Sequence, residues 1–195
     1  MSRVDEFRMF MSDHLINDIS INSVVQQLDE MDYFEAPASV GHHGNYSGGL
    51  YDHSYEVTVQ LLDLSDALGL KWERPESPYI IGMFHDLCKC RSYKKIPKSS
   101  DDFSEVGDEW IYDQFNLLPG HGDTSVILTQ QVVGRLTEEE IMCIRWHMGA
   151  FDDKEKWSCY SGAVKLFPNV LYTHTADMIL FPQINLAKNH AAYLV

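Results

Sequence analysis

The sequence predicts an all-α fold in a single domain. Apolar residues recur at intervals of three and four through most of the chain, which is the period of a helix with one buried face. The alternating pattern of a half-buried strand is weak throughout. The chain has 195 residues, which suits one domain, and 45% of them are hydrophobic, enough to build a core. We expect one domain over 1–195, in which the helices of 1–36 pack on a core of 40–181.

The N-terminal part of the chain predicts three helices. Two short helices are expected over 3–17 and 20–31, ahead of Pro37. A glycine-rich stretch, "GHHGNYSGGL", leads into a third helix over 50–68, which Gly69 would end. Residues of this third helix that share one face by their spacing are Leu50, His53, Val57, Leu61 and Leu64.

The middle of the chain predicts one apolar helix followed by irregular structure. The helix is expected over 77–89, with Ser77 as its cap and Pro78 in its first turn. Prolines and glycines interrupt residues 90–120, so this stretch is expected to be irregular.

The C-terminal part predicts three more helices, separated by a capping signal and by a loop. Thr137 and Glu140 form a capping box, and the loop 149–162 is rich in charged and aromatic residues. Pro182 would end the last helix. The expected helices span 123–135, 137–148 and a segment that begins at 163 or 170 and ends at 181.

The charge balance argues against some classes of partner. The formal net charge is −14, and an acidic surface repels the phosphate backbone of a long nucleic acid. A basic cluster within 89–98 is either a solvated loop or a receiver of an anionic substrate. No apolar run approaches the ~20 residues of a membrane helix, and the charged N-terminus lacks the apolar centre of a signal peptide. We expect a cytoplasmic protein without a membrane partner.

Several helices bring a histidine or an aspartate to an apolar face. His53, His85 and His147 lie on such faces, and His174 shares a stripe with Asp177. A single inward histidine is usually a hydrogen-bonded core residue, whereas a buried aspartate must be paired or metal-bound. Donors converging from several helices favour a divalent metal site, for which zinc, manganese, iron and nickel all suit these ligands.

The neighbouring pair His85–Asp86, in "IIGMFHDLCK", adds a geometric condition. Consecutive residues of a helix point about 100° apart. Both side chains therefore reach one metal only near a helix end or a widened turn; alternatively, Asp86 bridges two metals.

Three segments, "GGLYDHS", "MFHDLCK" and "YTHTADMI", resemble the ordered motifs of the HD-domain metal-dependent phosphohydrolase superfamily. The signature H…HD…D of that superfamily falls on His53, His85–Asp86 and Asp177. The residues of these motifs are most similar to those of the HD domains of 3′-5′ exoribonucleases and of relaxase-associated and phage HD proteins. Those exonucleases add a nucleic-acid-binding OB domain, for which we expect no room in this chain.

The resemblance implies a helical bundle with long connecting loops and one or two divalent ions. His121 in "PGHGDTSV" and His147 in "RWHMGAFD" resemble the extra ligands of members that hold two metals. Manganese, zinc, iron, nickel, cobalt and magnesium are the candidate ions. The implied ligands of the first ion are His53, His85, Asp86 and Asp177; Asp86 would bridge to a second ion held by His121 and His147.

The resemblance also implies hydrolysis by a metal-activated water, which Asp86 or Asp177 would orient. Lys89 could contact a phosphate oxygen or could be a solvated lysine at a helix end. His43 or its neighbour His42 could bind phosphate or assist a leaving group, or could lie in a surface loop. Weaker candidates are Arg91, Lys94 and Lys95 for substrate contacts, and Asp52 and Glu56 for orienting His53.

Four functions stay open at this point. The first is hydrolysis of a phosphoester or phosphoanhydride bond of a nucleotide, with a small anionic substrate as partner. The second is a 3′-5′ exonuclease or phosphodiesterase on short oligonucleotides, the third a di-iron oxygenase, and the fourth a binding module without catalysis. The loops 90–120 and 149–162 would set specificity but carry no readable motif. The identity of the substrate and that of the metal are therefore left open. The oligomeric state is open as well, and a homo-oligomer is one of the alternatives.

Overall fold

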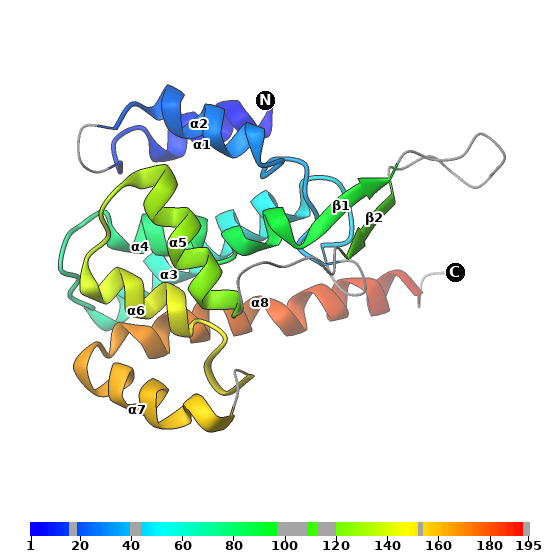
Figure 1. Cartoon of the computed structure of the whole chain (residues 1–195). Helices are drawn as coiled ribbons and strands as arrows, with labels where there is room; N and C mark the ends of the chain where they lie inside the picture. The colour runs from blue at the N-terminus through cyan, green and yellow to red at the C-terminus, as the bar shows by residue number, and fades with distance from the viewer. Residues whose placement is uncertain (16–18, 40–43, 97–108, 113–119, 152–153, 193–195) are drawn as a thin grey trace, which may run out of the picture.

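The structure, a computed structural model, describes residues 1–15, 19–39, 44–96, 109–112, 120–151 and 154–192, with the backbone alone for 109, 150 and 181–192. It is mostly helical, which confirms the predicted fold class (Figure 1). The α-helices are α1 Arg3–Met11, α2 Ile21–Glu30, α3 Gly49–Leu68, α4 Ser77–Phe84, α5 His121–Val133, α6 Glu138–Trp146, α7 Trp157–Leu166 and α8 Asn169–Ala192. Short 3-10 helices span Leu87–Arg91, Gly149–Phe151 and Lys154–Lys156.

The main helix packing runs through α3 and α6. α3 packs against α4 and α8, and α6 packs against α8 and α5. In Figure 1, α1 and α2 lie together on one side of these helices and α7 on the other. Phe7 of α1 belongs to the same hydrophobic cluster as Phe84 of α4, and the two rings lie 6.3 Å apart. The hydroxyl of Tyr33 donates to the carbonyl of Met83 at 2.7 Å, which ties the N-terminal segment to the end of α4.

Two glycines let helices approach closely near the candidate site. A Cβ atom at Gly82 of α4 would lie 2.4 Å from Oγ1 and 2.6 Å from Cα of Thr58 of α3. A Cβ atom at Gly122 of α5 would lie 2.1 Å from the carbonyl oxygen of Arg145 of α6. Both contacts are shorter than a methyl group tolerates, so glycine sets the distance between these helices.

A buried carboxylate links α4 to α6. The predicted capping box is present, because Thr137 accepts from the backbone of Glu140 and Glu140 accepts from the backbone of Thr137. Glu140 is fully buried and is also paired with Arg74, whose Nε lies 2.7 Å from its Oε1. Ser77 was predicted as the cap of α4, but it lies inside the helix and donates to Glu140 at 2.9 Å. Pro78 occupies the first turn, as predicted.

Several predicted boundaries are wrong. The first helix ends at Met11 instead of 17, and Ser12 and Asp13, which follow it, are residue types that favour caps and turns over helix interiors. The predicted helix 77–89 ends at Phe84. Asp86 leaves helical geometry with φ −104° and ψ 16°, and a 3-10 turn follows. α8 continues past Pro182 to Ala192, since one missing backbone donor does not break the flanking turns.

Two stretches predicted as irregular contain regular elements. Within 90–120, the strands β1 Tyr93–Ile96 and β2 Glu109–Tyr112 pair antiparallel, with Tyr93 opposite Tyr112. This hairpin projects from one side of the bundle in Figure 1. Within 149–162, α7 begins at Trp157 and packs a Tyr160 ring 6.0 Å from that of Trp146.

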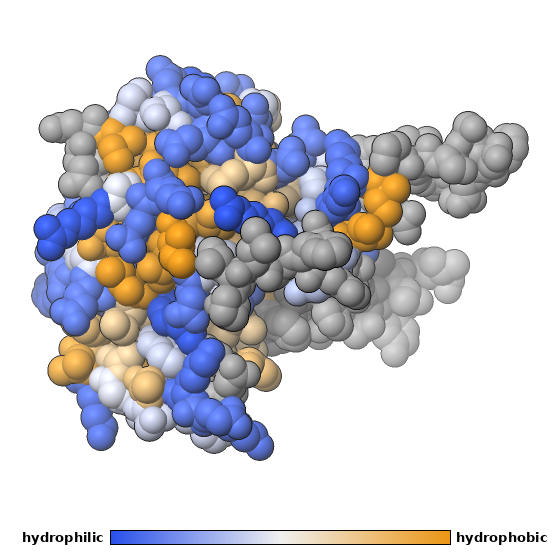
Figure 2. Space-filling model, in the orientation of Figure 1, coloured by the Kyte–Doolittle hydropathy of each residue, from blue (hydrophilic) through white to orange (hydrophobic). Residues whose placement is uncertain are grey.

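The surface is mixed on the face drawn in Figure 2. Hydrophilic residues dominate over α1 and α2, and hydrophobic residues reach the surface in the middle, around α5. Within the described residues, none of the helices combines the length and the apolar character that a membrane crossing demands.

Candidate metal centre

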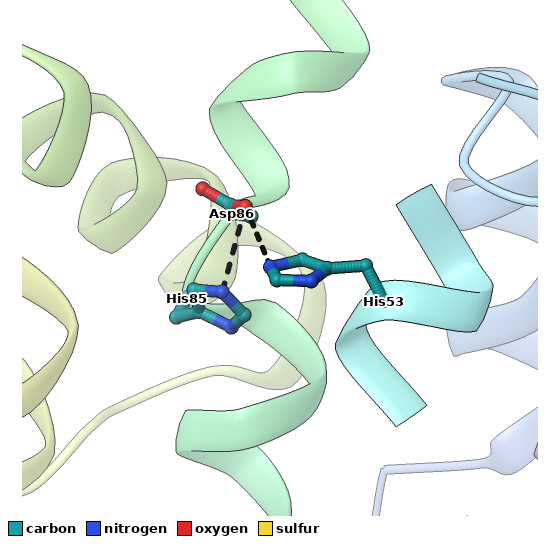
Figure 3. Close-up of side chains that lie close together, drawn as sticks. All are labelled: His53, His85 and Asp86. Atoms are coloured by element: carbon teal, nitrogen blue, oxygen red, sulfur yellow. Dashed lines mark ion pairs between the residues drawn. The ribbon is translucent and has the colours of Figure 1, made fainter. Parts of the chain in front are cut away.

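The candidate site is centred on the carboxylate of Asp86, which is almost completely buried. α4 ends at Phe84, so His85 is the C-cap and Asp86 lies in the first non-helical position. The helix end therefore lets both side chains face one centre, which is one of the two geometries that the adjacent pair allowed. Figure 3 shows the rings of His53 and His85 directed toward Asp86 from α3 and from the end of α4.

One oxygen of Asp86 faces two imidazoles and an ammonium group. Oδ2 lies 3.4 Å from Nε2 of His53, 3.5 Å from Nε2 of His85 and 2.5 Å from Nζ of Lys89. Asp177 of α8 joins the same group, because its Oδ1 lies 3.2 Å from Nε2 of His53. Three helices thus bring nitrogen and oxygen donors to one side of Asp86.

The other oxygen of Asp86 faces a second pair of imidazoles. Oδ1 lies 2.6 Å from Nε2 of His121, the first residue of α5, and 3.4 Å from Nε2 of His147, the C-cap of α6. The carboxylate consequently stands between two sets of donors. Sets whose ligand atoms all lie within 4.8 Å of one another are His53, His85 and Asp86; His85, His147 and Asp177; and Asp86, His121 and His147.

Backbone carbonyls orient two of these rings. Nδ1 of His85 lies 2.8 Å from the carbonyl of Gly82, and Nδ1 of His147 lies 2.7 Å from that of Ile144. A carbonyl only accepts, so each Nδ1 carries the proton and each Nε2 keeps its lone pair. Both Nε2 atoms are buried without a hydrogen bond within the described residues. A buried lone pair without a donor is unfavourable, and a cation would satisfy it.

His121 is held differently from these two rings. The sulfur of Cys88 lies 3.2 Å from Nδ1 of His121, while Nε2 of His121 contacts Asp86. A thiol therefore occupies the place that a backbone carbonyl takes at His85 and His147.

The charges of the site support one another. Burial would raise the pKa of Asp86, but Lys89 and the surrounding imidazoles hold it well below the usual value of a carboxyl. Burial would lower the pKa of Lys89, and the ion pair with Asp86 outweighs it and raises that pKa. Burial likewise opposes protonation of His53 and His121, yet hydrogen bonds to the carboxylates raise their pKa to about 9 and about 10. At His147, burial prevails and lowers the pKa.

A cavity of about 370 Å³ opens on this cluster. Its volume lies in the range of pockets that bind small molecules. Charged and imidazole side chains of the cluster line one part of it: His53, Asp86, Lys89, His121 and Asp177. Other lining residues are Ala38, Ser39, Tyr93, Met148, Phe151, His174 and Met178.

The structure thus brings together all six residues predicted as metal ligands, and it places Lys89 among them. Lys89 is largely buried and ion-paired, so the alternative of a solvated lysine is wrong. His43 and His42 lie outside the described residues. Asp52 forms an ion pair with Arg3 at 2.7 Å, and its suggested role of orienting His53 stays a prediction. Lys95 pairs with Glu35 at 3.0 Å and is not among the cavity residues.

Sequence reasoning missed two features of the site. The contact of the Cys88 thiol with His121 was not predicted, because the two residues lie 33 positions apart. The apolar cavity residues Met148, Phe151 and Met178 gave none either, since methionine and phenylalanine are typical core residues.

The chain resembles a known protein over part of its length. No protein-family model matches the chain, and no solved structure matches it. The chain is 37% identical over 89 residues to the dihydroneopterin 2',3'-cyclic phosphate phosphodiesterase of Methanocaldococcus jannaschii. The similarity covers 43% of this chain and 31% of that protein. The chain therefore spans less than a third of the length of the phosphodiesterase that it matches.

Proposed function

We propose that the protein is a metal-dependent phosphohydrolase of the HD type, with the whole of 1–195 as one domain. The observation that carries the proposal is the convergence of imidazole Nε2 atoms and two carboxylates on one cavity. Histidine nitrogens and carboxylate oxygens are ligands of divalent zinc, manganese, iron and nickel. The buried Nε2 lone pairs of His85 and His147 fit a cation and lack another donor among the described residues.

We assign the ligands as two overlapping sets. His53, His85, Asp86 and Asp177 would hold a first ion, and His121 and His147 would hold a second together with Asp86. Asp86 offers one oxygen to each side, which is the arrangement that a bridging carboxylate needs. A bound divalent ion would supply Lewis acidity, lowering the pKa of a coordinated water and neutralising charge on a phosphoryl oxygen.

The chain's own residues prepare the site for an anionic substrate. Lys89 keeps its proton because its ammonium group lies 2.5 Å from Asp86. It lines the cavity, so it can donate to a phosphate oxygen that enters. Asp86 or Asp177 would accept a hydrogen bond from the attacking water and orient it. The apolar residues beside the cluster exclude further water and strengthen these interactions.

The substrate that we propose is a phosphoester or phosphoanhydride of a nucleotide. The cavity volume of about 370 Å³ suits one small molecule. The net charge of −14 disfavours a long nucleic acid. A phosphodiester bond, in a cyclic nucleotide or a short oligonucleotide, is the second candidate. The likeness to a 2',3'-cyclic phosphate phosphodiesterase supports this second candidate.

The test combines metal analysis with activity. The protein is purified, stripped with a chelator and reloaded with manganese, cobalt, nickel, iron or zinc. It is then assayed for release of phosphate or nucleoside from mono-, tri- and cyclic nucleotides, and for cleavage of labelled oligomers. We expect turnover with at least one ion, and loss of turnover and of bound metal in His85→Ala. His14→Ala, at a ring stacked on Tyr79 and outside the cavity residues, is the control. No turnover of any substrate with any ion would refute the proposal.

A further inference from the structure

Four residues that line the cavity take no part in the proposed metal and phosphate contacts. Met148 and Phe151 reach it from the turn after α6, and His174 and Met178 reach it from α8, one helical turn apart. The backbone N–H of Phe151 donates to the carbonyl of Met148 at 3.0 Å, and the rings of Phe151 and His174 lie 6.4 Å apart. We call these four residues the apolar wall. All four line the cavity that the charged cluster also lines.

The ring of His174 has a fixed orientation in this wall. Its Nδ1 lies 2.7 Å from the carbonyl oxygen of His147, so Nδ1 donates and carries the proton. Its face lies against Gly149, where a Cβ atom would come within 2.7–2.8 Å of three ring atoms. Gly149 has φ +55°, a conformation that glycine adopts readily. In the neutral ring, Nε2 is therefore an acceptor held in place beside the cavity.

His174 is distinct from the candidate ligands. The sets of donors that could hold a metal within the described residues do not include it. Its nearest link to them is the bond to the backbone of His147, which leaves the ligand atom of His147 untouched. A histidine that is oriented so firmly, lines the cavity and is not in a ligand set needs another role.

We propose that the wall binds a planar heterocyclic ring of the substrate, and that Nε2 of His174 accepts a hydrogen bond from an N–H group of that ring. This inference rests on the proposed function, and it names the organic part of the substrate at the same site. Phenylalanine stacks on such rings, and the thioethers of Met148 and Met178 adapt to their faces. His174 is then a specificity-determining residue that contacts substrate. The charged cluster contacts the phosphate, and the wall contacts the base.

The experiment compares phosphates that differ only in the ring. Adenosine 5′-monophosphate, purine riboside 5′-monophosphate and ribose 5-phosphate share the phosphate and the sugar. Purine riboside lacks the amino group, which is the one N–H donor of adenine in a nucleotide. Affinities are measured by calorimetry on the metal-loaded protein, and kcat/KM is measured where turnover occurs. We expect the affinity for adenosine monophosphate to exceed that for ribose phosphate by about 5- to 100-fold, the range of base–aromatic stacking. It should exceed the affinity for purine riboside monophosphate by about 5- to 10-fold, the effect of one hydrogen bond.

Two variants separate substrate contact from structural support. The amide of His174→Asn can replace Nδ1 and keep the bond to the carbonyl of His147, but it offers nothing at Nε2. The amide of His174→Gln reaches the position of Nε2 and offers an acceptor there. We expect His174→Asn to bind metal normally and to lose the discrimination between the two purines, and His174→Gln to keep it. His14→Asn is the matched control and should change neither quantity.

The outcomes are distinguishable. Equal binding of ribose phosphate and adenosine monophosphate would overturn the role of the wall. Discrimination retained in His174→Asn, or metal lost in that variant, would overturn the role of His174 in substrate contact. If no nucleotide or oligomer is hydrolysed with any ion but adenosine monophosphate binds with the expected preferences, the proposed function fails, whereas recognition of the ring by the wall stands.

Discussion

The substitution Gly82→Ala tests whether the close approach of α3 and α4 sets the geometry of the site. The added Cβ would lie 2.4 Å from Oγ1, 2.6 Å from Cα and 2.8 Å from Cβ of Thr58. Ordinary contacts begin near 3.4 Å, so the shortfall is roughly 1 Å and includes a backbone atom. A rotamer change at Thr58 cannot relieve it. The two helices must separate, and His53 on α3 would move away from His85 at the end of α4.

The expected free energy follows from two opposing terms. Overpacking of a core costs about 1–3 kcal/mol, and a contact against backbone belongs at the upper end. Replacing glycine by alanine inside a helix stabilises the helix by about 1 kcal/mol, because alanine has the higher helix propensity. We therefore expect Gly82→Ala to lower the free energy of unfolding by about 2 kcal/mol.

The assay is urea unfolding together with calorimetric metal titration. Gly162→Ala is the matched control, because it lies in α7 and its added Cβ would meet no atom within 4 Å. It should raise the free energy of unfolding by about 0.5–1 kcal/mol and leave metal affinity unchanged. Gly82→Ala should weaken metal binding by at least about tenfold, since misplaced ligands lose much of their affinity. If Gly82→Ala proves as stable as the native protein and binds metal equally well, the reasoning is wrong.

Three other predictions concern the buried ion pair, a cap and the metal. Arg74→Ala leaves the buried Glu140 without its cation and should lower the free energy of unfolding by about 3–5 kcal/mol in urea titration; a loss under 1 kcal/mol would contradict it. Thr137→Ala removes one half of the capping box of α6 and should lower that free energy by about 1 kcal/mol, with an unchanged value as the contrary result. A divalent ion at 100 times its dissociation constant should raise the free energy of unfolding of the native protein by about 2.7 kcal/mol. It should leave that of His85→Ala unchanged, and thermal unfolding with and without the ion measures both.

The sequence was most informative where function and local structure coincide. Helical spacing placed His53 on the inward face of its helix, and the structure brings it within 3.4 Å of Asp86. The adjacent pair His85–Asp86 predicted a helix end or a widened turn, or an Asp86 that bridges two metals, and α4 ends there. The metal-binding role of these residues stays a prediction. Their convergence could be anticipated because a buried carboxylate and several buried imidazoles are too unfavourable to be scattered singly in a core.

The features that escaped prediction depend on residues far apart in the sequence. β1 and β2 pair across residues 97–108, and neither strand is long enough to carry a clear alternation by itself. The ion pair of Asp52 with Arg3 joins positions 49 apart, so spacing near His53 gave no sign of this pairing. The apolar wall was hidden for another reason: a methionine in a ligand pocket and one in a core look alike until the cavity is seen.

The bonds that hold the rings of His85 and His147 to backbone carbonyls have a consequence for metal affinity. His85 and His147 each bond through Nδ1 to the carbonyl three residues earlier in their own helix. The rotational freedom of both rings is therefore lost when the helices form, and capture of an ion needs no further ordering of them. Metal affinity at this centre should accordingly contain little unfavourable conformational entropy from these two rings. What remains adjustable is the separation of the helices, so changes in helix packing far from the cavity can tune how tightly an ion is held.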